Sequence, residues 1–284
     1  MKKTKRFSFR KFITVINGNR ELRSGLIILF LMLFVAFFGP LIAPFDPLKL
    51  SFLPLQAPSS TNLLGTDGYG RDLLSLIIYG TSTSMKIGFV AAMISGIIGT
   101  IVGGVSGYFG GKVDAVLNEV MNVFLMLPTF FLILMIIAYF GSSMFNIMIV
   151  IGLTTWTGNA RLMRAQAIAL RERTFVKSAI AMGESKWSIL VKHVIPNGIF
   201  PIIANTTMNI SGAILSEAGL SFLGLGDPNV ISWGQLIYHG KQFLPRSWWI
   251  CTYSGLTVVI TVLAFFLIGD GLNKVLSPKM AANK

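Results

Sequence analysis

Charged residues are scarce in this chain of 284 residues, because only 12% of them are Asp, Glu, Lys or Arg. A soluble domain carries about twice that charged fraction. More than half of the residues, 53%, are hydrophobic, and they form runs that a small soluble domain could not hide from water. The composition therefore excludes a soluble globular protein and predicts an integral membrane protein.

Reactive and metal-binding residues are also sparse, since the chain holds one cysteine and two histidines. Cys251 has no second cysteine with which to form an internal disulfide, and His239 has no partner at metal-ligand spacing. The nucleotide-binding pattern Gly-x-x-x-x-Gly-Lys-Ser/Thr is missing, as are a Ser/His/Asp constellation and a pair of catalytic carboxylates. We therefore expect no catalytic residue, no metal site and no cofactor in this chain, and a membrane enzyme is disfavoured.

Acidic residues are few as well: 11 Asp and Glu stand against 24 Lys and Arg, which gives a net charge of +13. In a soluble protein such an excess would indicate binding to nucleic acid. Here the basic residues mostly flank the hydrophobic runs, so the excess indicates membrane topology and contact with anionic lipid. No nucleic-acid partner is expected.

Six hydrophobic runs are long enough to cross a bilayer as helices. They cover residues 25–43, 84–108, 115–139, 144–163, 198–223 and 247–268. We therefore predict an all-α transmembrane protein with six spans, in which Pro128 kinks the third. Residues 224–246, which contain several Gly and Pro, predict a loop.

These runs divide the chain into five parts. They are an N-terminal tail (1–24), the first transmembrane helix (25–43), an extracytoplasmic segment (44–83), a five-helix core (84–272) that includes a polar loop (164–197), and a C-terminal tail (273–284). With six spans, both termini lie on one side, and 19 of the 24 Lys and Arg residues fall on that side. The positive-inside rule therefore predicts that both tails and the loop 164–197 are cytoplasmic.

Glycines recur three or four residues apart in the second run, at Gly96, Gly99, Gly103 and Gly107. That spacing places bare backbone on one face of a helix, where a neighbouring helix can approach closely. The second run is therefore predicted to be a packing centre of the bundle.

The predicted cytoplasmic loop contains the most informative segment, residues 175–197. A first helix should run to Met182, because Gly183 can adopt the left-handed conformation that ends a helix. Ser185 is a suitable N-cap for a second helix, which should stop near Pro196. The first arm carries the small residues Ser178, Ala179, Ala181 and Gly183, which let another protein approach the backbone. The segment predicts a protruding helix pair on which a soluble motor can act; the alternative is an interfacial helix that only binds lipid.

Acidic side chains at two places need partners. Asp67, Arg71 and Asp72 are predicted to form an ion-pair cluster that fixes the external loop, with a substrate role as the alternative. Glu217 falls within the fifth hydrophobic run, where an ionised carboxylate is costly unless it is paired or hydrated. One interpretation of Glu217 is a buried structural hydrogen bond, and the other is a role in gating or in the translocation path.

Four stretches of the chain resemble importer permeases of the ABC transporter superfamily. In the loop, Lys177, Ser178 and Ala179 stand at the Glu-Ala-Ala positions of that family's cytoplasmic motif, with Gly183 at its glycine and Ile195-Pro196 at its close. The other stretches are 64–75, 216–226 with 232–234, and 269–272 with Pro278. Their order along the chain is similar to that of the C-type permease subunit in the dipeptide, oligopeptide and nickel subfamily.

The resemblance implies a type I ABC importer permease fold that supplies half of a translocation path, completed by a second homologous permease subunit. It also implies two cytoplasmic ATPase subunits, which bind ATP and Mg²⁺, and an extracytoplasmic solute-binding protein. By the same resemblance, contact with the ATPase subunits is expected at Ser178, Ala179, Ala181, Gly183, Glu184 and Ser185.

The implied location is the cell membrane of a bacterium or an archaeon, where the chain contacts membrane lipid. The implied cargo is a dipeptide or an oligopeptide. Nickel or a metal chelate is the alternative cargo within the same subfamily, and a passive channel or scaffold subunit is the alternative from a different class.

Overall fold

The computed structural model describes residues 18–276, and within them the ordered elements are helices. They are α2 (Arg20–Ile42), α3 (Leu73–Phe109), α4 (Gly111–Met126), α5 (Thr129–Phe140), α6 (Met144–Thr155), α7 (Thr157–Arg171), α8 (Thr174–Ala181), α9 (Lys186–Ile189), the π-helix η1 (Leu190–Val194), α10 (Ile195–Phe222), α11 (Trp233–Lys241) and α12 (Trp248–Leu276). Beyond one isolated bridge between Thr66 and Asp72, these residues contain no β-structure, which confirms the predicted all-α class. Most of the N-terminal basic residues and Pro278 lie outside the described residues.

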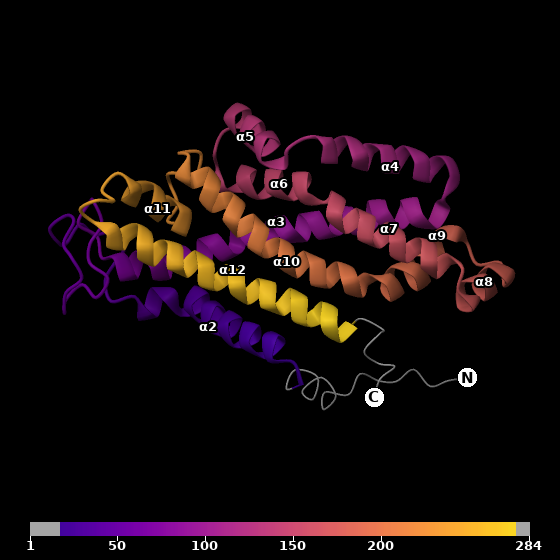
Figure 1. Cartoon of the computed structure of the whole chain (residues 1–284), viewed down its shortest axis with the longest axis horizontal. Coiled ribbons are helices and arrows are strands. Elements are labelled where there is room, and N and C mark those ends of the chain that lie inside the picture. Colours follow the sequence, from indigo (N-terminus) through magenta and orange to yellow (C-terminus); the bar gives the residue numbers. More distant parts are fainter. Residues whose placement is uncertain (1–17, 277–284) are drawn as a thin grey trace.

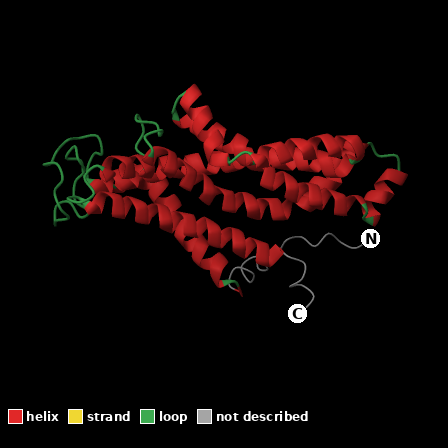
Figure 2. Cartoon of the chain, turned by 45° about the horizontal axis from the view of Figure 1, so that its top comes forward, coloured by secondary structure: helices red, strands yellow, loops and turns green. Residues whose placement is uncertain are grey.

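The long helices run side by side along the long axis of the molecule (Figure 1). Helix α11 and the long loops gather at one end, as Figure 2 also shows, and α8 and α9 project at the other end. The start of α2 and the end of α12 are joined by an ion pair of 2.5 Å between Glu21 and Lys274.

The glycine face of α3 packs directly against the backbone of α7, as the spacing of the glycines predicted. A methyl group added to Gly103 would lie 2.1 Å from the carbonyl oxygen of Ala160, and one added to Gly107 would lie 2.4 Å from that of Arg164. A methyl group added to Gly99 would likewise lie 2.4 Å from Cβ of Asn159. Only a residue without a side chain allows this approach, so these glycines set the distance between the two helices.

Helix α3 begins at Leu73, well before residue 84, where the hydrophobic run placed its start. Its 37 residues measure about 55 Å at the usual rise, whereas a hydrocarbon core is about 30 Å thick. The helix is therefore longer than the hydrocarbon core of a membrane, and hydropathy does not mark the residue at which it begins. Asp72 caps it by accepting hydrogen bonds from the amide and the hydroxyl of Ser75, so the irregular part of the predicted segment 44–83 ends at residue 72.

The loop between α2 and α3 is held by the acidic residues that the sequence singled out. Asp67 is 2% exposed, pairs with Arg71 at 2.7 Å and accepts the backbone amides of Tyr69 and Arg71 at 2.9 Å. Asp72 does not join this ion pair, contrary to the prediction, because its carboxylate caps α3. The predicted role of Asp67 and Arg71 in fixing the loop is confirmed.

By length and composition, four helices within residues 18–276 can cross a membrane: α2, α3, α10 with the residues from Lys186, and α12. The pair α4 and α5 adds a fifth span if the two count as one, although they meet at an angle of 83°. The expected kink at Pro128 is thus a full break between Met126 and Thr129. The run 144–163 is divided between the 12-residue apolar helix α6 and the more polar α7, so six spans stay a prediction.

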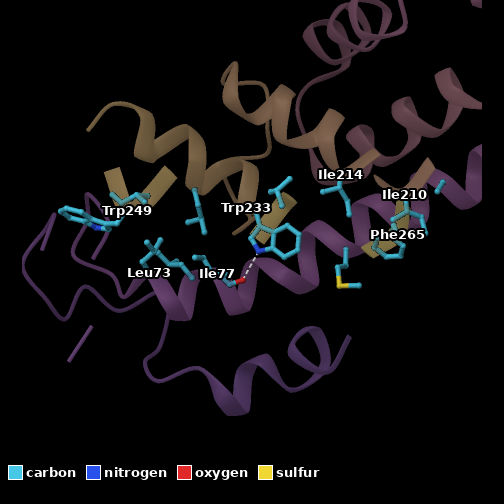
Figure 3. Packing of buried hydrophobic residues seen from close by; sticks show 13 residues of the cluster. Leu73, Ile77, Ile210, Ile214, Trp233, Trp249 and Phe265 are labelled. Atoms are coloured by element: carbon cyan, nitrogen blue, oxygen red, sulfur yellow. Dashed lines mark hydrogen bonds between the residues drawn. The ribbon is translucent and has the colours of Figure 1, made fainter. Parts of the chain in front are cut away.

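The region expected to be a loop, residues 224–246, holds helix α11, whose first residue is buried in the core (Figure 3). Trp233 is fully buried, and its indole N–H donates to the carbonyl oxygen of Ile77 in α3 at 3.1 Å. Its backbone amide donates to the hydroxyl of Ser84 at 3.1 Å. The Gly and Pro content of this region favoured a loop, and the nine-residue helix is too short to stand out from it. Burial of the large side chain of Trp233 against α3 stabilises the helix.

We expect Gly103→Ala to destabilise the folded protein by about 1–3 kcal/mol, because the added methyl group forces α3 and α7 apart. Thermal unfolding of the detergent-purified protein measures the effect. Gly255→Ala in α12 is the matched control, because a methyl group there meets no atom within 4 Å among the described residues. Equal unfolding midpoints for the two variants would show that the close approach does not limit stability.

Candidate functional site

Helices α8 and α9 with the turn between them form a hairpin, residues 172–189, which we call the α8–α9 hairpin (Figure 1). Gly183 has a φ of 79°, and the amides of Gly183 and Glu184 donate to the carbonyls of Ile180 and Ala179. This pair of bonds is a Schellman motif, which closes the end of α8. Ser185 then caps α9 by accepting the amide of Ser188 at 3.3 Å. The predicted end and restart of the helix are confirmed.

The root of the hairpin is packed against the ends of α3 and α7. Val176, Ala179 and Ile189 are at most 1% exposed and belong to one apolar cluster with Tyr108 of α3 and Met163 of α7. The ring of Trp187 adds a contact with Phe109 of α3, with the centroids 4.9 Å apart. The hairpin is therefore anchored to the bundle and is not a free loop.

The prediction that the second helix stops near Pro196 is wrong. The chain stays helical from Lys186 to Phe222, through the π-helical turn η1 and into α10. Pro196 lies in the first turn of α10, where a missing N–H and a fixed φ are tolerated. The π-helical turn before it absorbs the change of hydrogen-bond register. The second arm of the hairpin and the fifth hydrophobic run are consequently one helical rod.

The six residues expected to contact a partner do not share one environment. Ser178, Ala181, Gly183 and Ser185 are exposed, and Glu184 is half-buried. Ala179 is 1% exposed because its side chain belongs to the root of the hairpin. The structure brings the other five together at the tip, and their role in docking stays a prediction.

The tip also presents large apolar side chains that the sequence argument did not select. Met182 is 80% exposed, Trp187 61% and Ile180 52%. Exposed basic residues flank them, with Lys177 one helical turn before Ile180 and Lys186 next to Trp187. Helical spacing gave no signal for Ile180, because it stands four residues after the buried Val176 and would be assigned to the same face. The tip is an apolar surface with a basic rim.

Glu184 links the turn to the second arm of the hairpin. The hydroxyl of Ser188 donates to its carboxylate at 2.6 Å, and Nε2 of His193 lies 2.8 Å from the other oxygen. The hydrogen bond with Ser188, followed by that with His193, lowers the pKa of the Glu184 carboxyl. This carboxylate therefore stabilises the turn in its ionised form.

Glu217 lies at the opposite end of the same rod. It is 3% exposed and accepts the hydroxyls of Ser221 and Ser232, both at 2.8 Å. A methyl group on Gly234 would lie 2.9 Å from the same carboxylate, so a glycine is needed there. Glu217 makes the buried hydrogen bonds of the first interpretation and ties α10 to the start of α11. Its role in gating stays a prediction.

Long helices that are apolar on their outside, joined to a protruding hairpin, define an α-helical membrane protein. The family described as binding-protein-dependent transport system inner membrane component matches residues 96–282, and the N-terminal transmembrane domain of oligopeptide transport permease C matches residues 23–61. The chain therefore belongs to this family of ABC transporter permeases.

Curated relatives match nearly the whole chain. The Escherichia coli K12 protein named as a probable D,D-dipeptide transport system permease is 34% identical over 280 residues, which are 98% of this chain and 94% of that protein. The dipeptide transport system permease of Alkalihalophilus pseudofirmus is 34% identical over 96% of this chain and 90% of that protein. The di/tripeptide transport system permease of Pseudomonas aeruginosa is also 34% identical, over 92% of this chain and 89% of that protein.

A solved structure shares the fold at low sequence identity. It is the MetNI methionine ABC transporter in inward-facing conformations, which matches with a TM-score of 0.56 and 19% identity. The match covers 70% of this chain and 96% of that chain. The predicted type I ABC importer permease fold is confirmed.

We expect Gly183→Val to distort the tip of the hairpin, because a β-branched residue at a φ of 79° is strained by about 1–2 kcal/mol. Uptake by the assembled importer should be abolished while membrane insertion persists. Gly141→Val is the matched control, because Gly141 also has a positive φ, 89°, and open space around it, but lies between α5 and α6. Normal uptake by Gly183→Val would contradict a coupling role for the tip.

Glu184 predicts an acid-sensitive turn. Because its pKa is lowered in the folded hairpin, the stabilisation is complete above the ordinary value of 4.5 and is lost as the pH falls further. Hydrogen exchange at the amides of Ser188 and Ile189, corrected for the intrinsic rate, should show protection that declines below that pH. In Glu184→Gln, the protection of these two amides should not change with pH. If the variant and the wild type show the same dependence of protection on pH, this role of Glu184 is excluded.

Proposed function

We propose that this chain is a permease subunit of an ATP-driven importer of short peptides in a bacterial cell membrane. It crosses the membrane six times with both termini in the cytoplasm, so that the α8–α9 hairpin is cytoplasmic as well. The charge asymmetry of the sequence supports this orientation, because 19 of the 24 Lys and Arg residues fall on the side of the hairpin.

The observation that carries the proposal is the continuous helix from Lys186 to Phe222. Its first residues form the second arm of the hairpin, and its last residues reach Glu217 and the contact with Ser232. A force on the hairpin is thus applied to the end of one helix that continues across the membrane, with the π-helical turn η1 and Pro201 as its irregular points. Two cytoplasmic ATPase subunits, which bind ATP and Mg²⁺, move the hairpin, and the spans alternate between inward-open and outward-open states.

The surface of the tip supports docking to another protein. Met182, Ile180 and Trp187 expose apolar side chains at the end of the molecule that projects farthest from the bundle (Figure 1). Buried at an interface, one such side chain contributes about 1.5–3 kcal/mol. The exposed basic rim fits an apolar pocket with acidic edges on the ATPase subunit.

Relatives whose names specify dipeptides or di/tripeptides support a peptide as cargo. A second homologous permease subunit completes the path, and an extracytoplasmic solute-binding protein delivers the peptide. Nickel uptake and passive conduction are the competing outcomes of the uptake test.

The test uses the complete importer with Met182→Glu in this chain. We expect uptake of a labelled dipeptide to fall at least about tenfold, because a carboxylate replaces the apolar contact at the tip. Met182→Leu keeps that contact and should transport normally. Thr174→Glu places the same charge at the other, also exposed, end of α8 and should also transport normally.

Dipeptide and nickel uptake are measured with and without ATP in the same vesicles. ATP-dependent dipeptide uptake supports the proposal. Uptake without ATP would identify a passive channel, and ATP-dependent uptake of nickel alone would identify the other cargo. Full activity of Met182→Glu would show that the ATPase subunits act elsewhere.

A further inference from the structure

One face of α10 carries polar and small residues along most of its length. Asn205, Asn209, Gly212 and Ser216 follow one another at spacings of four, three and four, so they lie on one side of the helix. We call them the polar face of α10. Gly212 is exposed and the other three are half-buried, so this face is open in the chain.

The other sides of α10 are used for packing within the chain. Ile210 and Ile214 point into the apolar cluster with α3 (Figure 3). The hydroxyl of Ser211 donates to the carbonyl of Val262 in α12 at 2.9 Å, and the hydroxyl of Thr206 donates to Asn159 of α7 at 3.4 Å. The polar face therefore lies between α7 and α12, and among the described residues the contact of Asn205 with α7 accounts for one of its four members.

Hydrogen-bond partners are incomplete on this face. The amide of Asn205 donates to Asn159 at 2.9 Å. The side chains of Asn209 and Ser216 have no hydrogen-bond partner among residues 18–276. Both lie well inside the hydrophobic run 198–223, where lipid offers polar groups neither a donor nor an acceptor. Polar groups at that depth face water or another polar surface in the assembled protein.

We infer that the polar face of α10 lines the aqueous translocation path and binds the main chain of the transported peptide. This inference rests on the proposed function and adds the residues that hold the cargo. Every peptide offers main-chain N–H and C=O groups. The amide of Asn209 and the hydroxyl of Ser216 can each donate to a peptide C=O and accept from a peptide N–H.

Neutral polar groups of this kind suit a path that carries peptides of many different sequences. They bind without reading the side chains of the cargo, and they bind weakly enough to release it. The face holds no carboxylate, thiolate or imidazole, which are the side chains expected of a nickel site. The residue of α7 next to Asn205 is Gly158, which is exposed and has no side chain that could narrow the polar face.

Water access tests the placement of this face. Asn209→Cys and Ser216→Cys are made with Cys251→Ser in the complete importer, together with Leu263→Cys in α12 as the control. Leu263 is 47% exposed in the chain, but its apolar side chain suits contact with lipid. We expect a charged, membrane-impermeant methanethiosulfonate to label the first two sites about tenfold faster, because reaction needs a hydrated thiolate. Dialanine should slow that labelling.

Transport tests the role in binding. Asn209→Leu should raise the KM for dialanine about tenfold through loss of a hydrogen bond in the path. Thr207→Val is the matched control, because Thr207 lies on the opposite side of α10 and its hydroxyl donates to the carbonyl of Ile203 at 2.9 Å. The KM of this control should stay at the wild-type value. Membrane levels of all variants are compared by immunoblot.

The outcomes separate this inference from the proposed function. Absence of ATP-dependent dialanine uptake by the wild-type importer would overturn the proposed function. Normal uptake with no labelling of Asn209→Cys or Ser216→Cys would overturn the inference and place this face against the second permease. An unchanged KM for Asn209→Leu would also overturn it.

Discussion

The close contact between α3 and α7 is the constraint on which the rest of the structure depends. Within hydrocarbon the backbone must satisfy its own hydrogen bonds, so helices associate by fitting surfaces and not by excluding water. Gly99, Gly103 and Gly107 let α7 lie directly on the backbone of α3. The position of α7 in turn fixes where the α8–α9 hairpin leaves the bundle, and the ends of both helices form the pocket for its buried root.

The second structural principle is continuity of the helix that follows the hairpin. From Lys186 to Phe222 it spans 37 residues, or about 55 Å at the usual rise. One end is held by the apolar root of the hairpin, and the other by Glu217, which binds Ser232 at the start of α11. The hairpin and the opposite end of the bundle are therefore joined by a single element and one buried hydrogen-bonded contact.

Polar residues inside the bundle fall into two groups with different consequences. Asn159 and Glu217 are buried and bonded to neighbouring side chains, so they add specificity to the packing of α10 against α7 and α11. Asn209 and Ser216 lie on an open side of α10, where burial by the rest of the chain does not explain them. This contrast separates polar groups that hold the fold together from those available to a ligand.

The sequence by itself determined the features that depend on neighbouring residues. These include the all-α class, a bend at Pro128, the turn at Gly183 with its cap at Ser185, and the ion pair of Asp67 with Arg71. Each follows from local backbone preferences or from charges a few residues apart. Glycine spacing also identified the packing face of α3, because it repeats with the period of the helix.

Only the tertiary structure decided where elements continue, and which side chains they bury. The extension of α3 back to Leu73, the passage of the helix through Pro196 and the burial of Trp233 in α11 depend on partners far away in the sequence. The same holds for the hairpin, where packing against α3 and α7 hides Ala179 and leaves Met182 exposed. Local patterns cannot rank such contacts, because the free energy of burial depends on the surface that meets each residue in the folded chain.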